Sequence, residues 1–207
     1  MGHRSDTRFL VLHGLRLKGF GEPPAIAAAV GLDDSAVTEH LAKLAADDLV
    51  LHRDGRLTGW TLTAAGRAEQ QRLAAADLEA SGALADIRAV YKRFLAMNQD
   101  FKVLCTDWQV RDGELYDHAD DAYNTTIVER LRAMHTDVVE VLGELAGAVE
   151  RYAEYRPRFD AAVEGFEGGD LDLLTKPLID SYHTIWFELH EDLITGLGID
   201  RSQEGSF

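Results

Sequence analysis

Cysteine is nearly absent from this sequence. Among 207 residues there is one, Cys105. A single thiol cannot form an internal disulfide, and cysteine-rich zinc sites need several thiols. We therefore expect a protein of a reducing compartment whose fold depends on its hydrophobic core and not on cross-links.

Long apolar runs are also missing. No segment approaches the roughly 20 apolar residues of a membrane span, and the first residues, MGHRSDTRFLVLHGL, lack the apolar core and cleavage site of a secretion signal. With 46% hydrophobic residues the chain can still bury a sizeable core, in one or two domains. The sequence predicts a soluble, cytoplasmic protein that makes no membrane contact.

Positive charge is scarce, and its distribution is uneven. The chain has 21 Lys and Arg against 36 Asp and Glu, a net charge of -15. Residues 1–80 carry nine basic and eleven acidic side chains, whereas residues 81–207 carry twelve and 25. An acidic surface repels phosphate over at least a Debye length, so only the first part suits a polyanion. We place a domain junction near Ser81 and Gly82, which gives predicted domains 1–80 and 81–207.

Motifs of catalysis are absent as well. The sequence contains no G-x-S-x-G, no glycine-rich phosphate loop and no H-E-x-x-H, and Cys105 falls among regularly spaced apolar residues. The prediction is a protein that is not an enzyme and needs no cofactor.

The first 80 residues do carry strong helix signals. Asp6 can cap a helix that ends at Gly19, and EPPAIAAAVG places prolines at the start of a second helix and Gly31 at its end. A three-residue turn follows. A third helix, Ser35–Ala46 with Asp34 as its cap, then has Val37, Leu41, Leu44 and Ala45 on one face.

A hairpin signal comes next. LVLHRDGRLTGWTLT consists of two β-prone runs around the turn HRDGR, and AAGRAEQQRLAAADL returns to a helical pattern. Three helices followed by a hairpin predict a winged helix-turn-helix domain, in which the hairpin is the wing.

The stretch AIAAAVGLDDSAVTEHLAKLAADDLV, the basic hairpin tip and WTLTAAGRA together resemble the winged-helix regulators of the MarR, PadR and ArsR types, over about the first third of the chain. The resemblance implies that helix 35–46 enters the DNA major groove and that Arg53 and Arg56 form the wing. Glu39 stands where these families commonly have arginine. Acidic residues also flank the helix, at Asp33, Asp34, Asp47 and Asp48.

Double-stranded operator DNA is the partner that this resemblance implies. Ser35, Thr38 and Glu39 are expected to contact base edges, where a glutamate can accept a hydrogen bond from cytosine N4. The expected phosphate contacts are Arg4, Arg8, Arg16, Lys18, Lys43, Arg53 and Arg56. The alternative is a winged helix that has become a protein-interaction or ligand-sensing module, which charge reversal on the recognition helix would favour.

The second domain is predicted to be an all-α helical bundle. An apolar stripe at spacings of three and four runs through Leu84, Ile87, Tyr91, Phe94, Asn98, Phe101, Cys105 and Trp108. It predicts one helix of about 25 residues that pairs with a second chain or lines an internal core. Further helices are expected at 120–154, from Pro157 and from Pro177. Since no helix precedes the winged-helix segment, we expect the C-terminal half to form a homodimer, as in the PadR type.

Two groups of polar and aromatic residues form the predicted effector site for a small organic ligand. They are Trp108, Gln109, Asp117 and His118 around a turn, and His183, Trp186 and His190 on the last helix. The alternative is that the histidines are hydrogen-bonded core residues. No metal site is predicted, because seven residues place His183 and His190 about 10.5 Å apart along a helix, too far to share one ion.

Overall fold

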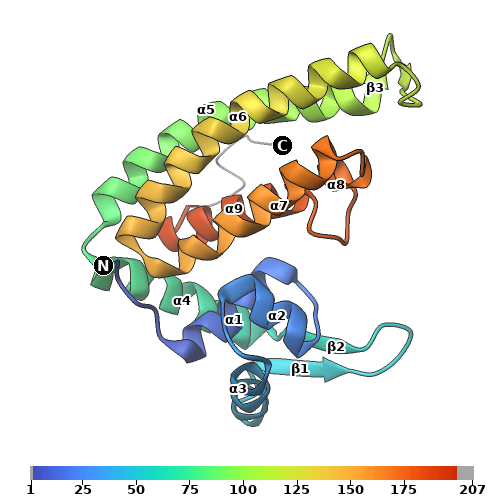
Figure 1. The fold of residues 1–207 in the computed structure, drawn as a ribbon. Coiled ribbons are helices and arrows are strands. Elements are labelled where there is room, and N and C mark those ends of the chain that lie inside the picture. The colour runs from blue at the N-terminus through green and yellow to red at the C-terminus, as the bar shows by residue number, and fades with distance from the viewer. Residues whose placement is uncertain (1, 200–207) are drawn as a thin grey trace.

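The computed structural model describes residues 2–199, which form a mainly helical structure with small antiparallel hairpins (Figure 1). The helices are α1 (Thr7–Lys18), α2 (Pro23–Val30), α3 (Asp34–Ala46), α4 (Ala64–Ser81), α5 (Leu84–Gln109), α6 (Asp121–Ala148), α7 (Tyr155–Glu167), α8 (Asp172–Thr175) and α9 (Tyr182–Leu197), with a 3-10 turn, η1 (Glu150–Glu154), between α6 and α7. Strand β1 (Val50–Arg53) pairs with β2 (Gly59–Leu62), and β3 (Val110–Arg111) pairs with β4 (Glu114–Leu115).

Local signals set the first three helices. The Asp6 carboxylate accepts hydrogen bonds from the backbone amides of Arg8 and Phe9, which caps α1, and Gly31 ends α2 with a φ of 65°. The expectation that Asp34 caps the third helix is wrong by one residue. Asp33 holds the extended capping conformation, and Asp34 is already the first helical residue.

Helices α1 to α3 and the β1–β2 hairpin share one small core. Its buried members are Val11, Leu12, Leu15, Ile26, Ala27, Val37, Leu41, Leu44, Val50 and Leu62. Val50 pairs with Leu62 at the base of the hairpin, so β1 begins and β2 ends in this core. Gly21, in the α1–α2 connection, exchanges two backbone hydrogen bonds with Trp60 and fixes the hairpin beside the helices.

The long helices α5 and α6 lie side by side as an antiparallel arm, with α7 and α9 between them and the N-terminal helices (Figure 1). Every member of the predicted apolar stripe on α5 is buried except Leu84, which is 38% exposed. Trp186 of α9 donates its indole N–H to the Asn98 side-chain oxygen at 2.8 Å. The stripe therefore lines the core of its own chain.

Three helix boundaries in the second half differ from expectation, and one hairpin was not expected. The helix expected from Pro157 begins at Tyr155. The last helix begins at Tyr182 and not at Pro177, because Ser181 caps it by accepting from the Thr184 amide, while Leu178 has a left-handed φ of 67°. The helix expected at 120–154 ends at Ala148, before η1. The β3–β4 hairpin interrupts a region expected to be entirely helical, because Asp112 and Gly113 both take positive φ and reverse the chain.

Helix α4 connects the two predicted domains. It ends at Gly82, in left-handed conformation, where the junction was expected. However, Leu17 of α1 and Leu78 of α4 belong to the same buried cluster as α5, α6, α7 and α9. The core of the C-terminal half thus extends onto α1 and α4, while the smaller core of α1 to α3 and the hairpin remains a separate cluster. None of the helices within residues 2–199 is long and apolar enough to cross a membrane.

Gly66 marks the closest packing of α4 against the chain before β1. A Cβ atom at this position would lie 1.9 Å from the Leu49 carbonyl oxygen, whereas a Cβ on Gly143 of α6 would meet nothing within 4 Å. We expect Gly66→Ala to lower the free energy of unfolding by at least about 2 kcal/mol through overpacking. Gly143→Ala, the matched control, should raise it by about 0.5–1 kcal/mol. Urea denaturation would measure the free energy of unfolding of both variants. Equal effects would contradict the close packing of Gly66 against Leu49.

Candidate nucleic-acid interface and ligand sites

Helix α3 separates cleanly into a buried and an exposed face. Its buried apolar side chains are Val37, Leu41 and Leu44. The residues expected to contact bases and phosphates, Ser35, Thr38, Glu39 and Lys43, are all exposed. The structure thus brings these four predicted site residues together on one helix face.

The charge of Glu39 is balanced on the helix surface. Lys43, one turn later, donates to its carboxylate at 2.6 Å, and this hydrogen bond lowers the pKa of Glu39. Thr38 donates its hydroxyl to the carbonyl oxygen of Asp34 and keeps its lone pairs exposed. The exposed face of α3 therefore offers hydrogen-bond acceptors and little net charge.

The β1–β2 hairpin carries Arg53 and Arg56, both exposed. His52 and Trp60 face each other across the two strands, with ring centroids 4.9 Å apart, and stiffen the hairpin below its tip. Within residues 2–199, neither arginine forms an ion pair. These two cations are consequently available to an outside anion.

Other predicted phosphate contacts are already matched inside the molecule. Arg8 pairs with Asp47 at 2.9 Å. Arg16 pairs with Glu191 of α9 at 2.6 Å, and Lys18 pairs with Glu188 of the same helix at 2.9 Å. No sequence pattern indicates these pairs, because the partners on α1 and α9 are more than 160 residues apart. Arg16 and Lys18 join α1 to α9, so the proposed phosphate contacts do not include them.

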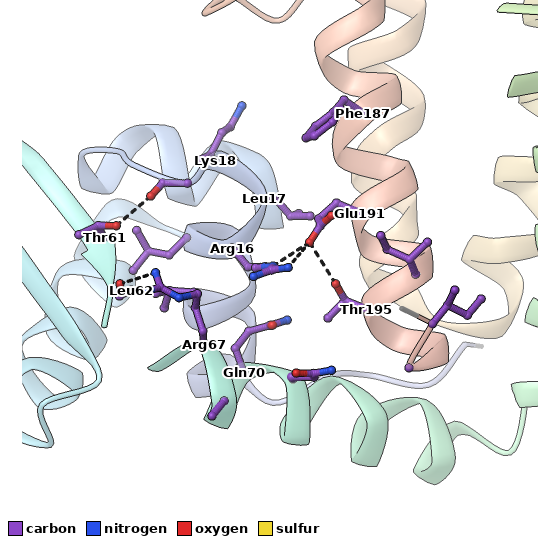
Figure 2. A pocket seen from close by; sticks show the side chains of 17 residues that line it. Arg16, Leu17, Lys18, Thr61, Leu62, Arg67, Gln70, Phe187, Glu191 and Thr195 are labelled. Carbon is purple, nitrogen blue, oxygen red and sulfur yellow. Dashed lines mark hydrogen bonds and ion pairs between the residues drawn. The ribbon is translucent and has the colours of Figure 1, made fainter. Parts of the chain in front are cut away.

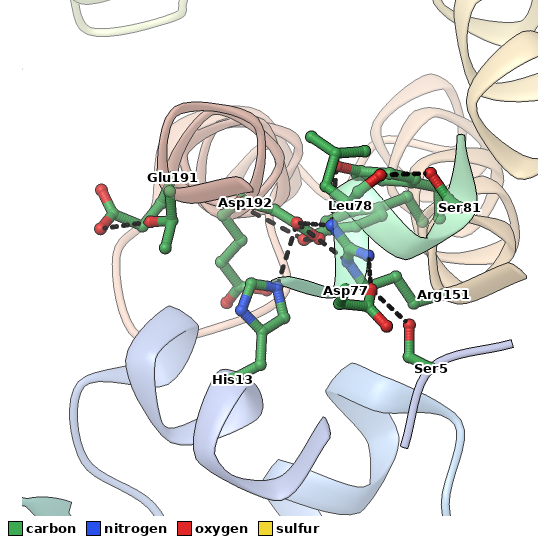
Figure 3. Close-up of polar contacts among 12 residues, drawn as sticks. Ser5, His13, Asp77, Leu78, Ser81, Arg151, Glu191 and Asp192 are labelled. Carbon is green, nitrogen blue, oxygen red and sulfur yellow. Dashed lines mark hydrogen bonds and ion pairs between the residues drawn. The ribbon is translucent and has the colours of Figure 1, made fainter. Parts of the chain in front are cut away.

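A buried charge network continues this junction between α1, α4, η1 and α9 (Figure 3). The Arg151 guanidinium contacts Asp77 at 2.7 Å and Asp192 at 3.1 Å, and all three side chains are at most 8% exposed. The His13 ring nitrogen Nε2 lies 3.1 Å from Asp192 on the other side. Tyr155 donates its hydroxyl to the second Asp192 oxygen at 3.2 Å. Side chains from α1, α4, η1, α7 and α9 thus meet at the carboxylates of Asp77 and Asp192.

The electrostatic balance in this network favours the charged forms. Burial alone would raise the pKa of Asp192, but Arg151 and His13 lower it further than burial raises it, so the net pKa lies well below the ordinary value. Burial also opposes the charge of Arg151, but Asp192, Tyr152 and Asp77 together outweigh it, so the pKa of Arg151 is raised. The ion pairs therefore persist at neutral pH.

The predicted effector residues on α9 lie mostly in the core. Trp186 stacks on Phe94 and Phe101 with ring centroids 4.9 and 4.4 Å apart, and His190 lies against Phe94 at 5.2 Å. His183 is exposed at the edge of the stack, where partial burial of its ring lowers its pKa. Of the three predicted residues on this helix, only His183 is open to a ligand.

The other predicted group lies at the hairpin end of the arm. Trp108 is buried and stacks on His118 at 3.9 Å, and burial lowers the pKa of His118. Gln109 and Asp117 are exposed. Asn98, the hydrogen-bond partner of Trp186, precedes Trp108 by ten residues on α5. The two positions are therefore about 15 Å apart along the helix axis. The structure does not bring the two predicted groups into one pocket.

An open cleft of about 870 Å³ lies elsewhere, between α1, β2, α4 and α9 (Figure 2). Its lining includes none of the seven predicted effector residues. The polar part of the lining includes Arg16, Lys18, Arg67, Gln71 and Glu191. Sequence reasoning missed this cleft because its residues come from four elements without a common motif.

Metal and thiol chemistry find little support in the described part of the chain. No group of three or more His, Cys, Asp or Glu side chains within residues 2–199 could hold a metal ion. Burial raises the pKa of the Cys105 thiol to about 12, which leaves it protonated and unreactive.

Comparisons with protein-family models, with curated proteins and with solved structures find no significant match to this chain.

Loss of the Arg151 guanidinium would leave Asp77 and Asp192 buried without their shared cation. We expect Arg151→Ala to lower the free energy of unfolding by about 3–5 kcal/mol. Arg156→Ala, in α7, removes an exposed arginine paired with Asp160 and should change stability little. Chemical denaturation at pH 7 would measure the free energy of unfolding of both variants. An Arg151→Ala protein as stable as the control would refute the structural role of the network.

Proposed function

We propose that the protein is a DNA-binding transcriptional regulator with an N-terminal winged helix-turn-helix. The observation that carries the proposal is the pairing of α2 and α3 through a three-residue turn, Gly31 to Asp33, next to a hairpin with two exposed arginines. In helix-turn-helix proteins the second helix enters the major groove and places its side chains against base edges. Helix α3 would take that position, and the β1–β2 hairpin would contact the adjoining backbone.

The placement of charge supports this orientation. Helix α3 and the hairpin lie on the opposite side of the molecule from the α5–α6 arm (Figure 1). The C-terminal part, residues 81–207, carries most of the excess acidic charge. DNA approaching α3 would meet Arg53 and Arg56 first, with the acidic part turned away.

A protein-interaction module is the second candidate function. It is favoured by Glu39 and by Asp33, Asp34, Asp47 and Asp48, which make the surroundings of α3 acidic. The two candidates differ in their dependence on salt, since only contacts with DNA phosphates release condensed counterions.

Removal of both wing arginines should weaken binding to DNA of any sequence. For Arg53→Ala with Arg56→Ala we expect the slope of log affinity against log salt to flatten by about 0.9 for each phosphate that is no longer neutralised. Fluorescence anisotropy with fragments of the DNA upstream of the protein's own gene, at several salt concentrations, measures this slope.

The matched control is Arg88→Ala with Arg93→Ala, which removes the same charge from α5 and should leave the slope unchanged. Glu39→Arg should raise non-specific affinity and reduce sequence preference, because it replaces a base acceptor with a cation that seeks phosphate. If the unaltered protein binds none of these fragments even at low salt, the interaction module becomes the better explanation.

A homodimer is part of the proposal, because one winged helix with two wing arginines makes few phosphate contacts. The α5 stripe is buried within the chain and cannot supply the dimer contact. An exposed apolar strip remains at the end of the arm, where Val103, Val110 and Leu115 are 54%, 38% and 87% exposed. Val103 lies on α5, and Val110, the first residue of β3 directly after α5, pairs with Leu115 across the β3–β4 hairpin.

The protein should have twice its single-chain mass of 22.9 kDa in solution at micromolar concentration. Val103→Glu with Leu115→Glu should give the single-chain mass, because charges would be buried in the strip. Leu178→Glu changes a fully exposed leucine outside the strip and should leave the dimer intact. Light scattering measures all three masses, and a single-chain mass for the unaltered protein would end the dimer part of the proposal.

A further inference from the structure

We propose that the cleft between α1, β2, α4 and α9 binds a small organic anion with a planar ring, and that this anion competes with Glu191 for Arg16. The volume of about 870 Å³ lies within the range of small-molecule sites. The site differs from both groups of effector residues that the sequence indicated.

Three cations line the cleft, and two of them are already paired with carboxylates. Its lining contains three cationic side chains, Arg16, Lys18 and Arg67, and one carboxylate, Glu191. Lys18 is already paired with Glu188 and Asp180. Arg67 donates one N–H to the Leu62 carbonyl oxygen at 3.0 Å, and its residue is exposed. Because a guanidinium has five N–H donors, Arg67 can hold a carboxylate or phosphate in addition.

An aromatic side chain borders the same cleft. Phe187 of α9 is 47% exposed, and it lies at the upper end of the cleft in Figure 2. Ile199 and the nearly buried Leu62 and Ile194 complete the apolar lining. A planar ring would cover this surface, and offset stacking on Phe187 would orient it.

The Arg16–Glu191 pair lies in the cleft and joins α1 to α9 (Figure 2). Glu191 accepts from two nitrogens of Arg16, at 2.6 and 2.7 Å, and it is 5% exposed. An anion bound at Arg67 would attract the Arg16 guanidinium and weaken this link. Removing the charge of Glu191 should therefore strengthen anion binding, an effect that a purely structural ion pair would not have.

Ligand binding in this cleft would also affect DNA binding. Thr61 and Leu62 of β2 line the cleft, and β2 is the second strand of the proposed wing. A ligand that fills the cleft would therefore contact both β2 and α9. This coupling rests on the proposed function, whereas anion binding itself can be measured without DNA.

Calorimetric titration of the full-length protein tests the site with two matched pairs of probes. Phenylacetate with neutral phenylacetamide represents a carboxylate, and adenosine monophosphate with adenosine represents a phosphate. We expect at least one anion to bind, about tenfold more tightly than its neutral partner, which corresponds to about 1.4 kcal/mol. The pair that responds identifies the anionic group.

Variants then locate the site. Arg67→Gln should weaken the anion about tenfold, Phe187→Ala should weaken it several-fold, and Glu191→Gln should tighten it several-fold. The control variants Arg132→Gln and Glu167→Gln, from an ion pair between α6 and α7, should change nothing. Arg67 and Phe187 are exposed, so these two variants test the site even if Glu191→Gln does not fold.

The proposal is overturned if neither anion binds at millimolar concentration, if a neutral partner binds as well as its anion, or if Arg67→Gln leaves affinity unchanged. Weaker binding by folded Glu191→Gln would also overturn the competition with Arg16. Anion binding with the expected variant effects, in a protein that binds no DNA, would support the site and refute the proposed regulator.

Discussion

The Arg151 guanidinium lies between the carboxylates of Asp77 and Asp192, with 2% of its side chain exposed, and the relation between the two halves of the molecule depends on it. Asp77 belongs to α4 and Asp192 to α9. Because buried charges are costly without partners, moving either helix away would leave an unpaired ion in the core. The network therefore fixes the orientation of the N-terminal helices relative to the C-terminal bundle.

Helix α9 is the element on which these contacts converge. One part of its surface packs against the aromatic core through Trp186, and another carries Glu188, Glu191 and Asp192 toward α1 and Arg151. The helix is thus buried on nearly every side. Any ligand that alters one of its ion pairs would act on the N-terminal helices, because no other helix makes as many charged contacts with α1 among the described residues.

The proposed DNA-binding surface is built differently from this junction. Its polar side chains are exposed on α3 and on the hairpin, and only the base of each element enters the core. Substitutions that change the charge of such a surface therefore leave the fold intact. Glu39 can therefore occupy the proposed recognition helix, with Lys43 compensating its charge one turn away.

The sequence by itself determined the local elements. Asp6, Gly19, Gly31 and Gly82 end or begin helices through capping and left-handed backbone conformations, which depend on a few neighbouring residues. The spacing of apolar residues likewise indicated the buried faces of α3 and α5, because a helix repeats every 3.6 residues. The start of α9 was predicted wrongly. Pro177 was expected to begin the helix, but Ser181 caps it and the helix begins at Tyr182.

Only the tertiary structure decided the partners of charged and aromatic residues. From the sequence, Arg16 was expected to contact DNA phosphate. In the structure it forms an ion pair with Glu191, which is 175 positions away in the chain. From the sequence, Trp186 and His190 were expected to bind a ligand. In the structure they are packed against the rings of Phe94 and Phe101. The cleft at Arg67 has no sequence signal at all. Periodicity and caps are short-range properties that a chain carries in its sequence, whereas ion pairing, burial and cavities depend on which distant segments pack together.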